Sequence, residues 1–137
     1  MAKRPQPLLP ETNTDEFWAG VRAGELRYQT CDDCNDVVFT PRRHCTQCMS
    51  ANLTWKVSKG EGSVYTYSVV VQNRVPAFIE LGAYSVAYID LDEGFRMLST
   101  VVVDDPMTEI AIGQRVRVDF EAQEGDDASP IPVFRPL

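Results

Sequence analysis

The residues best suited to chemistry in this chain are its four cysteines, which all lie within an 18-residue stretch. They form two Cys-x-x-Cys pairs, Cys31/Cys34 and Cys45/Cys48, with ten residues between the pairs. Each pair brings two sulfurs to one ion, and two pairs joined by a hairpin complete a tetrahedral shell. The spacing therefore predicts a four-cysteine metal site, for which zinc is favoured.

A closed shell of four thiolates predicts a structural ion. A catalytic zinc keeps one position open for water, whereas four thiolates fill the shell and overcompensate the charge of the ion. Iron in the same ligand set is the alternative metal. Free or disulfide-bonded cysteines are the alternative to a metal site. The residue after each pair often adopts a left-handed conformation, which suits Asn35 but costs about 1–2 kcal/mol at Met49.

Few other residues suit catalysis. His44 is the one histidine and directly precedes the second cysteine pair, so we interpret it as a surface residue of the hairpin. With the cysteines assigned to metal, no Ser/His/Asp or Cys/His constellation is expected. The adjacent carboxylates Asp104/Asp105 and Asp126/Asp127 lie in predicted turns, where neighbouring side chains diverge into solvent. The chain is therefore not predicted to be catalytic by itself.

The segment before the cysteines, residues 1–25, is predicted to be extended and proline-rich and then to form a short helix. Asn13 is the expected N-cap, with Glu16 as its capping-box partner. Gly24 is the expected C-terminal stop. The helix carries Phe17 and Trp18, which either anchor a partner or pack on their own domain.

The rest of the chain alternates in the manner of β-strands. Residues 26–59 contain three short strands around the cysteine pairs and are predicted to form a zinc ribbon. Residues 60–137 contain four β-rich runs and a proline-flanked closing strand, with a tight turn at residues 92–94. The predicted fold is all-β with small α content: a short helix, a four-cysteine zinc ribbon, and a five-stranded OB-fold barrel. A small two-sheet sandwich is the alternative to the barrel.

The charge of the chain is acidic and uneven. It has 13 Lys/Arg against 20 Asp/Glu, a net charge of −7, and residues 61–137 carry 5 against 13, which is −8. Nucleic-acid binders gain affinity from cations that neutralise phosphates. A nucleic-acid-binding ribbon/OB module, with Tyr65 and Tyr67 on one strand face stacking bases, is therefore the less favoured function. Without a signal peptide or a membrane-length apolar stretch, the protein is expected to be cytoplasmic.

An apolar connection between barrel strands favours a binding role. Residues 71–82, VQNRVPAFIELG, are too apolar for an ordinary surface loop. Phe78 and Ile79 are therefore predicted to contact a partner or ligand, with folding back as a barrel plug as the alternative.

A set of motifs occurs in a defined order along the chain. After the Phe-Trp helix come L-x-x-Q-x-C-x-x-C from Leu26, a second cysteine pair after Pro41, a strand ending at Trp55, G-x-G-x-V-Y-T-Y from Gly60, D-E-G-x-R from Asp92, I-G-x-x-V from Ile112 and a terminal P-x-F. Over roughly residues 13–136 the chain resembles the zinc-ribbon/OB-fold acyl-CoA-associated family, long catalogued as a domain of unknown function.

This resemblance implies a rubredoxin-like zinc ribbon joined to an OB barrel. It also implies a non-catalytic accessory subunit of a thiolase-superfamily enzyme, in a hetero-oligomer that acts on acyl-CoA. The partner would be a thiolase or, slightly favoured, a retro-aldolase of steroid side-chain degradation, which the subunit stabilises and whose acyl-CoA channel it helps to shape. The phosphates of CoA would need cations, for which Arg42, Arg43, Arg74 and Arg96 are candidates. Solvated surface arginines are the alternative interpretation of these four residues.

Overall fold

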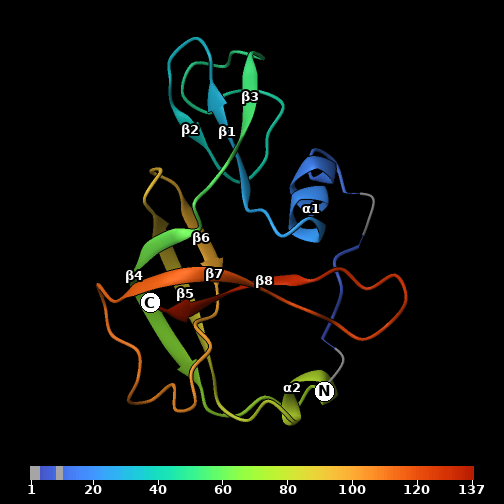
Figure 1. Ribbon diagram of the computed structural model, residues 1–137, viewed down its shortest axis with the longest axis vertical. Helices are drawn as coiled ribbons and strands as arrows, with labels where there is room; N and C mark the ends of the chain where they lie inside the picture. The colour runs from blue at the N-terminus through green and yellow to red at the C-terminus, as the bar shows by residue number, and fades with distance from the viewer. Residues whose placement is uncertain (1–3, 9–10) are drawn as a thin grey trace.

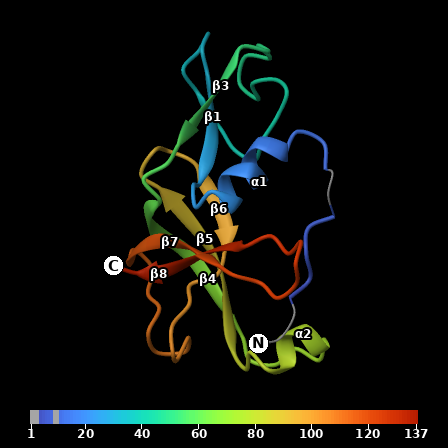
Figure 2. The same ribbon diagram turned by 45° about the vertical axis from the view of Figure 1, so that its right-hand side comes forward.

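The computed structural model describes residues 4–8 and 11–137. A small sheet of three strands stands above a barrel of five strands, and helix α1 lies beside the junction between them (Figures 1 and 2). Neither helix in the described residues has the length and apolar character needed to cross a bilayer. The elements are α1 (Asp15–Arg22), β1 (Arg27–Cys31), β2 (Val37–Val38), β3 (Leu53–Val57), β4 (Glu61–Val70), α2 (Pro76–Ile79), β5 (Tyr84–Leu91), β6 (Arg96–Ser99), β7 (Arg115–Glu121) and β8 (Ile131–Pro136).

Helix α1 starts one residue later than the capping prediction requires. Asn13 has a φ of 68°, a left-handed conformation that an N-cap does not use, and Thr14 occupies the cap position. The Thr14 hydroxyl donates to the Glu11 carbonyl oxygen (3.0 Å). The Glu16 carboxylate accepts a hydrogen bond from Arg27 (2.7 Å) and so holds the helix to strand β1. The predicted capping box of Asn13 and Glu16 is therefore wrong.

The small sheet has the antiparallel order β2-β1-β3, with Gln29 of β1 at its centre. Gln29 is buried, and its side-chain amide bonds both backbone groups of Arg42: Nε2 donates to the carbonyl oxygen (3.0 Å), and the backbone N–H donates to Oε1 (2.8 Å). This side chain therefore fixes the segment that leads into the second cysteine pair.

The five-stranded sheet has the order β6-β5-β4-β7-β8 and closes on itself. Beyond β6, Val101 forms a parallel bridge with Phe134 of β8. The Val102 N–H donates to the Phe134 carbonyl oxygen (2.8 Å), and the Phe134 N–H donates to that of Thr100 (2.9 Å). Closure removes the free edges of the sheet. The predicted five-stranded OB barrel is confirmed, and the two-sheet sandwich is not observed.

A β-bulge interrupts the long strand β4. Val64 pairs with Ile89 and Thr66 with Tyr88, so Tyr65 has no partner across the strand. An extra residue reverses the alternation of side chains after it. Tyr67, which would point outward with Tyr65 in a regular strand, consequently packs against the core, whereas Tyr65 is exposed. The prediction that Tyr65 and Tyr67 share one face is wrong.

An aromatic junction connects the helix, the ribbon and the barrel. Phe17 contacts Phe39 edge-to-face with ring centroids 5.9 Å apart, Phe39 stacks on Phe95 at 4.8 Å, and Tyr28 stacks on Phe95 at 5.0 Å. These three parts of the chain thus share one hydrophobic core. The division into residues 1–25, 26–59 and 60–137 stays a prediction.

Candidate metal centre and binding surfaces

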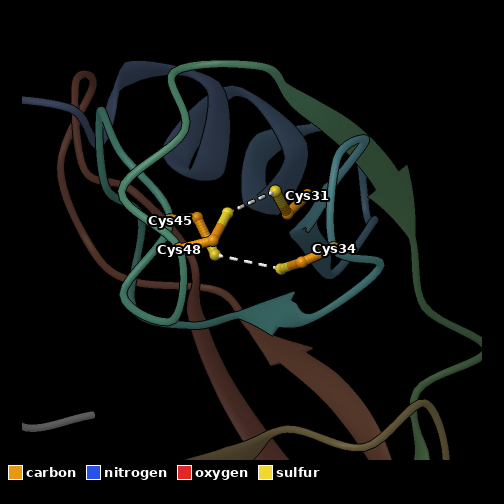
Figure 3. A group of neighbouring side chains, drawn as sticks. All are labelled: Cys31, Cys34, Cys45 and Cys48. Atoms are coloured by element: carbon orange, nitrogen blue, oxygen red, sulfur yellow. Dashed lines mark hydrogen bonds between the residues drawn. The ribbon is translucent and has the colours of Figure 1, made fainter.

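The four cysteines converge at the tip of the ribbon, and their side chains point toward one another (Figure 3). All four sulfurs lie within 4.8 Å of one another, with Cys31–Cys48 at 3.5 Å and Cys34–Cys45 at 3.6 Å. A tetrahedral zinc with Zn–S bonds of about 2.3 Å holds its sulfurs roughly 3.8 Å apart. The arrangement therefore fits one zinc ion bound by four sulfurs. His44 is exposed and does not belong to this group.

The two cysteine turns have the same backbone geometry. The Asn35 N–H donates to the Cys31 carbonyl oxygen (2.9 Å), and the Met49 N–H donates to that of Cys45 (3.0 Å). Asn35 has a φ of 63° and Met49 a φ of 65°. Both positions thus have the predicted left-handed conformation, and at Met49 a β-carbon makes it unfavourable.

Asp33 connects the two turns, a role that sequence reasoning did not assign. Its carboxylate accepts hydrogen bonds from the Ser50 hydroxyl and from Nδ2 of Asn52 (3.1 Å). These bonds lower the pKa of Asp33, so it stays ionised over a wider pH range. In the sequence, this role is indicated only by a short acidic residue between two cysteines. Its partners, Ser50 and Asn52, lie far along the chain and meet it only in the folded protein.

The electrostatics of the thiols favour a bound cation. The backbone N–H of Cys34 lowers the pKa of Cys31 to about 7, although burial opposes this effect. The backbone N–H of Asp36 lowers the pKa of Cys34, but burial and the neighbouring sulfurs outweigh it and raise that pKa to about 12. The sulfurs around Cys34 therefore oppose its ionisation. A divalent cation removes this opposition because it stabilises the thiolate form.

Three of the four predicted interface residues meet around one groove. Phe17, Trp18 and Phe78 line a groove of about 670 Å³, together with the ribbon turn, residues 39–41, and residues of the barrel. Ile79 lies outside the groove lining and is 58% exposed. Sequence reasoning missed the contributions of the ribbon turn, β5, β6 and the start of β8, because these segments meet only in the folded chain.

The connection between β4 and β5 does not fill the barrel. It forms helix α2 at the end of the molecule away from the ribbon (Figure 2), and no residue of this helix is buried. Phe78 stacks on Tyr84 with ring centroids 5.3 Å apart, and Nδ2 of Asn73 donates to the Tyr84 hydroxyl (2.9 Å). The connection is thus ordered by its own contacts and forms one wall of the groove.

The four candidate arginines do not form one cluster. Arg42 and Arg43 are exposed on the ribbon, whereas Arg74 lies in the connection at the opposite end of the molecule (Figure 1). Arg96 of β6 bonds Asp90 (2.6 Å) and lies 3.5 Å over the ring of Tyr65. A role of these residues in CoA binding stays a prediction.

Two family models match consecutive parts of the chain. The rubredoxin-like zinc ribbon domain of ChsH2 matches residues 18–54, and the C-terminal OB-fold domain of ChsH2 matches residues 55–121. The chain belongs to this ChsH2 zinc-ribbon and OB-fold family. Membership confirms the resemblance described above, the combination of ribbon and barrel, and zinc as the structural ion.

Relatives within the family have different descriptions. A probable enoyl-CoA hydratase alpha subunit from Thermomonospora curvata is 34% identical over 98% of this chain, which spans only 40% of that relative. A DUF35 domain-containing scaffold protein from Methanothermobacter thermautotrophicus is 32% identical over 85% of this chain and 89% of its own length. A solved structure described as an Ltp2-ChsH2(DUF35) aldolase superposes with a TM-score of 0.80 at 30% identity, covering 97% of this chain and 98% of that one.

Proposed function

We propose that this protein is a non-catalytic accessory subunit of a thiolase-superfamily acyl-CoA enzyme. A retro-aldolase of the steroid side-chain degradation type is favoured over a thiolase as the partner, since the similar solved structure is described as an aldolase with two named components. The observation that carries the proposal is the closed four-sulfur site, which uses every cysteine of the chain and leaves no open coordination position in its ligand set.

The groove gives this subunit a surface for binding. Its volume of about 670 Å³ lies in the range of ligand-sized sites, and its aromatic walls come from elements that the barrel and the zinc ribbon hold rigidly. In a complex, Trp18 and Phe78 would contact the partner or form one wall of its acyl-CoA channel, whereas Phe17, which is 7% exposed, would support them from the core. The zinc would act only by holding the ribbon turn at the rim of this groove.

Phosphate groups of CoA would need cations near the channel. Within the described residues, Arg42, Arg43 and Arg74 are exposed and form no ion pair, so they are available for this role. Arg96 would have to exchange its bond to Asp90 for a phosphate. The first three arginines are therefore the better candidates.

The proposal is tested by co-expression of this chain with a thiolase-superfamily protein from the same organism. We expect a stable complex in size-exclusion chromatography, with acyl-CoA turnover by the complex and none by this chain alone. Turnover by the isolated chain would show that it is an enzyme in its own right. Failure of the two proteins to associate would remove the accessory role.

A further inference from the structure

The outward surface of the barrel is charged over β7. Alternate residues of this strand point away from the core and pair with neighbouring strands. The pairs are Arg115 with Asp92 (2.6 Å), Arg117 with Glu61 (2.5 Å) and Arg135 with Asp119 (2.7 Å). Such a surface is well hydrated and suits contact with water.

The outward surface of β5 and β6 is apolar instead. Val86, Tyr88 and Leu98 are 37%, 44% and 55% exposed, and Tyr88 lies directly opposite Leu98 in the strand register. The bulged Tyr65 is 50% exposed and lies beneath Arg96. The charges beside this surface neutralise each other, because Arg96 bonds the carboxylate opposite it on β5.

We infer that this β5–β6 apolar face, made of Tyr65, Val86, Tyr88 and Leu98, is the docking face for the catalytic partner. The inference rests on the proposed function and adds the surface and the chemistry of the partner. Val86 and Leu98 also line the groove, so the face and the groove form one continuous apolar surface. Tyrosine and arginine at the centre of an apolar patch are typical of interface hot spots.

At the Tyr65 end of this face, the side chains are already ordered before association. Arg96 is held by two hydrogen bonds to Asp90, at 2.6 and 3.2 Å, and itself covers the ring of Tyr65. A partner that covers this face would bury a paired guanidinium and carboxylate, which avoids the cost of an unpaired charge. Little side-chain entropy is lost when preordered groups are buried.

The charge that lines the groove and the cavity beside it determines which partner fits. Glu11 lines the groove, and Glu80, Asp104 and Glu121 line the adjoining cavity. Arg4 is the single basic residue lining these two cavities in the described part of the chain, and it pairs with Glu121 (3.2 Å). Four acidic groups against one basic group leave a charge of −3. A second copy of this chain, or a nucleic acid, would bring like charge to this rim. The partner therefore presents an apolar ridge flanked by Lys or Arg side chains.

The test measures affinity for a thiolase-superfamily protein from the same organism. Leu98→Lys places a cation on the face, and Tyr88→Ser shortens a side chain that does not line the groove. Ile112→Lys is the matched control, since Ile112 is 71% exposed and lies outside the face. We expect at least about tenfold weaker binding for both face variants, no more than about twofold for the control, and wild-type binding that weakens with salt. Circular dichroism melting confirms that the variants are folded.

Each other outcome overturns a different statement. Unchanged affinity of folded Leu98→Lys and Tyr88→Ser would remove the face and leave the accessory role standing. Absence of any wild-type complex would remove the accessory role and the face together. If the chain alone formed a dimer that Leu98→Lys dissociated, the occupant would be a second copy and the assignment of a basic partner would be wrong.

Discussion

The tip of the ribbon and the barrel are stabilised in different ways. The tip has a core of only three buried residues, Cys31, Val38 and Cys45, with Leu53 packed beside them. The barrel shares with α1 a core of fourteen buried residues, among them Ile89 and Phe134. So small a core does not stabilise a fold by burial alone, which is why the tip needs a metal. In the tip, zinc therefore replaces hydrophobic packing.

The two regions still depend on each other at their junction. Tyr28 and Leu26, at the base of the ribbon, belong to the core of the barrel. The aromatic junction joins Tyr28 to Phe95 after β5 and, through Phe39, to Phe17 of α1. Loss of zinc should therefore unfold the tip but leave the base of the ribbon in place.

Removal of zinc has the largest expected effect and separates the two regions most clearly. Structural zinc contributes about 10 kcal/mol or more to small ribbons, so Cys31→Ser or chelation should unfold the tip. Hydrogen exchange should show that amides of the tip, residues 31–53, lose protection while those of β5 keep it. Elemental analysis should show that the zinc content falls from about one ion per chain. Protection of the tip in metal-free Cys31→Ser would contradict this account.

Truncation in the barrel core should destabilise the whole protein. Ile89 is fully buried, so Ile89→Ala should cost about 2–5 kcal/mol in the free energy of unfolding. Denaturant unfolding followed by circular dichroism measures this loss, with the exposed Ile112→Ala as the matched control. If Ile89→Ala left the free energy of unfolding unchanged, the barrel core would not determine the stability of the whole protein.

Replacement of Gln29 tests how the ribbon holds the segment that leads into its second cysteine pair. Gln29→Ala leaves the backbone N–H and carbonyl of Arg42 without their partners, which should cost about 2 kcal/mol. Gln47→Ala, at an exposed position of the ribbon, is the control. Thermal unfolding should show a lower melting temperature only for Gln29→Ala. Equal melting of the two variants would mean that water replaces both hydrogen bonds without loss.

The smallest expected effect distinguishes the two cysteine turns. Met49→Gly removes a β-carbon from a left-handed residue and should stabilise the zinc-bound ribbon by about 0.5–1 kcal/mol. Asn35→Gly should stabilise the zinc-bound ribbon by a smaller amount, since asparagine tolerates the left-handed conformation. Competition with a zinc chelator measures both changes. Weaker zinc retention by Met49→Gly would show that the exposed methionine stabilises the turn in another way.

The features predicted from the sequence are those fixed by local geometry. The left-handed residues after each cysteine pair follow from the turn itself, and the alternation in residues 115–121 follows from the pleat of a strand. The five-stranded barrel followed from the spacing of such runs. The capping residue was misplaced by one position, because Asn13 itself takes a left-handed conformation that only the path of the preceding chain determines.

The features that could not be predicted depend on strand register and on contacts between distant segments. The bulge at Tyr65 left no pattern in the sequence, since the residues around it are all compatible with either face. The groove collects side chains from α1, the ribbon turn, the β4–β5 connection, β5, β6 and β8. The contact of Arg96 with Tyr65 joins residues on different strands. None of these features can be predicted until the pairing register of β4, β5 and β6 is known.

The bulge in β4 also limits how the family can evolve. Before it, Gly62 and Val64 face inward, and a β-carbon on Gly62 would lie 2.4 Å from the Asp90 carbonyl oxygen; after it, Tyr67 faces inward. Gain or loss of one residue in this strand would turn half of it inside out. We therefore expect homologous barrels to keep the length of β4 constant, while insertions and deletions accumulate in the connection at residues 71–82.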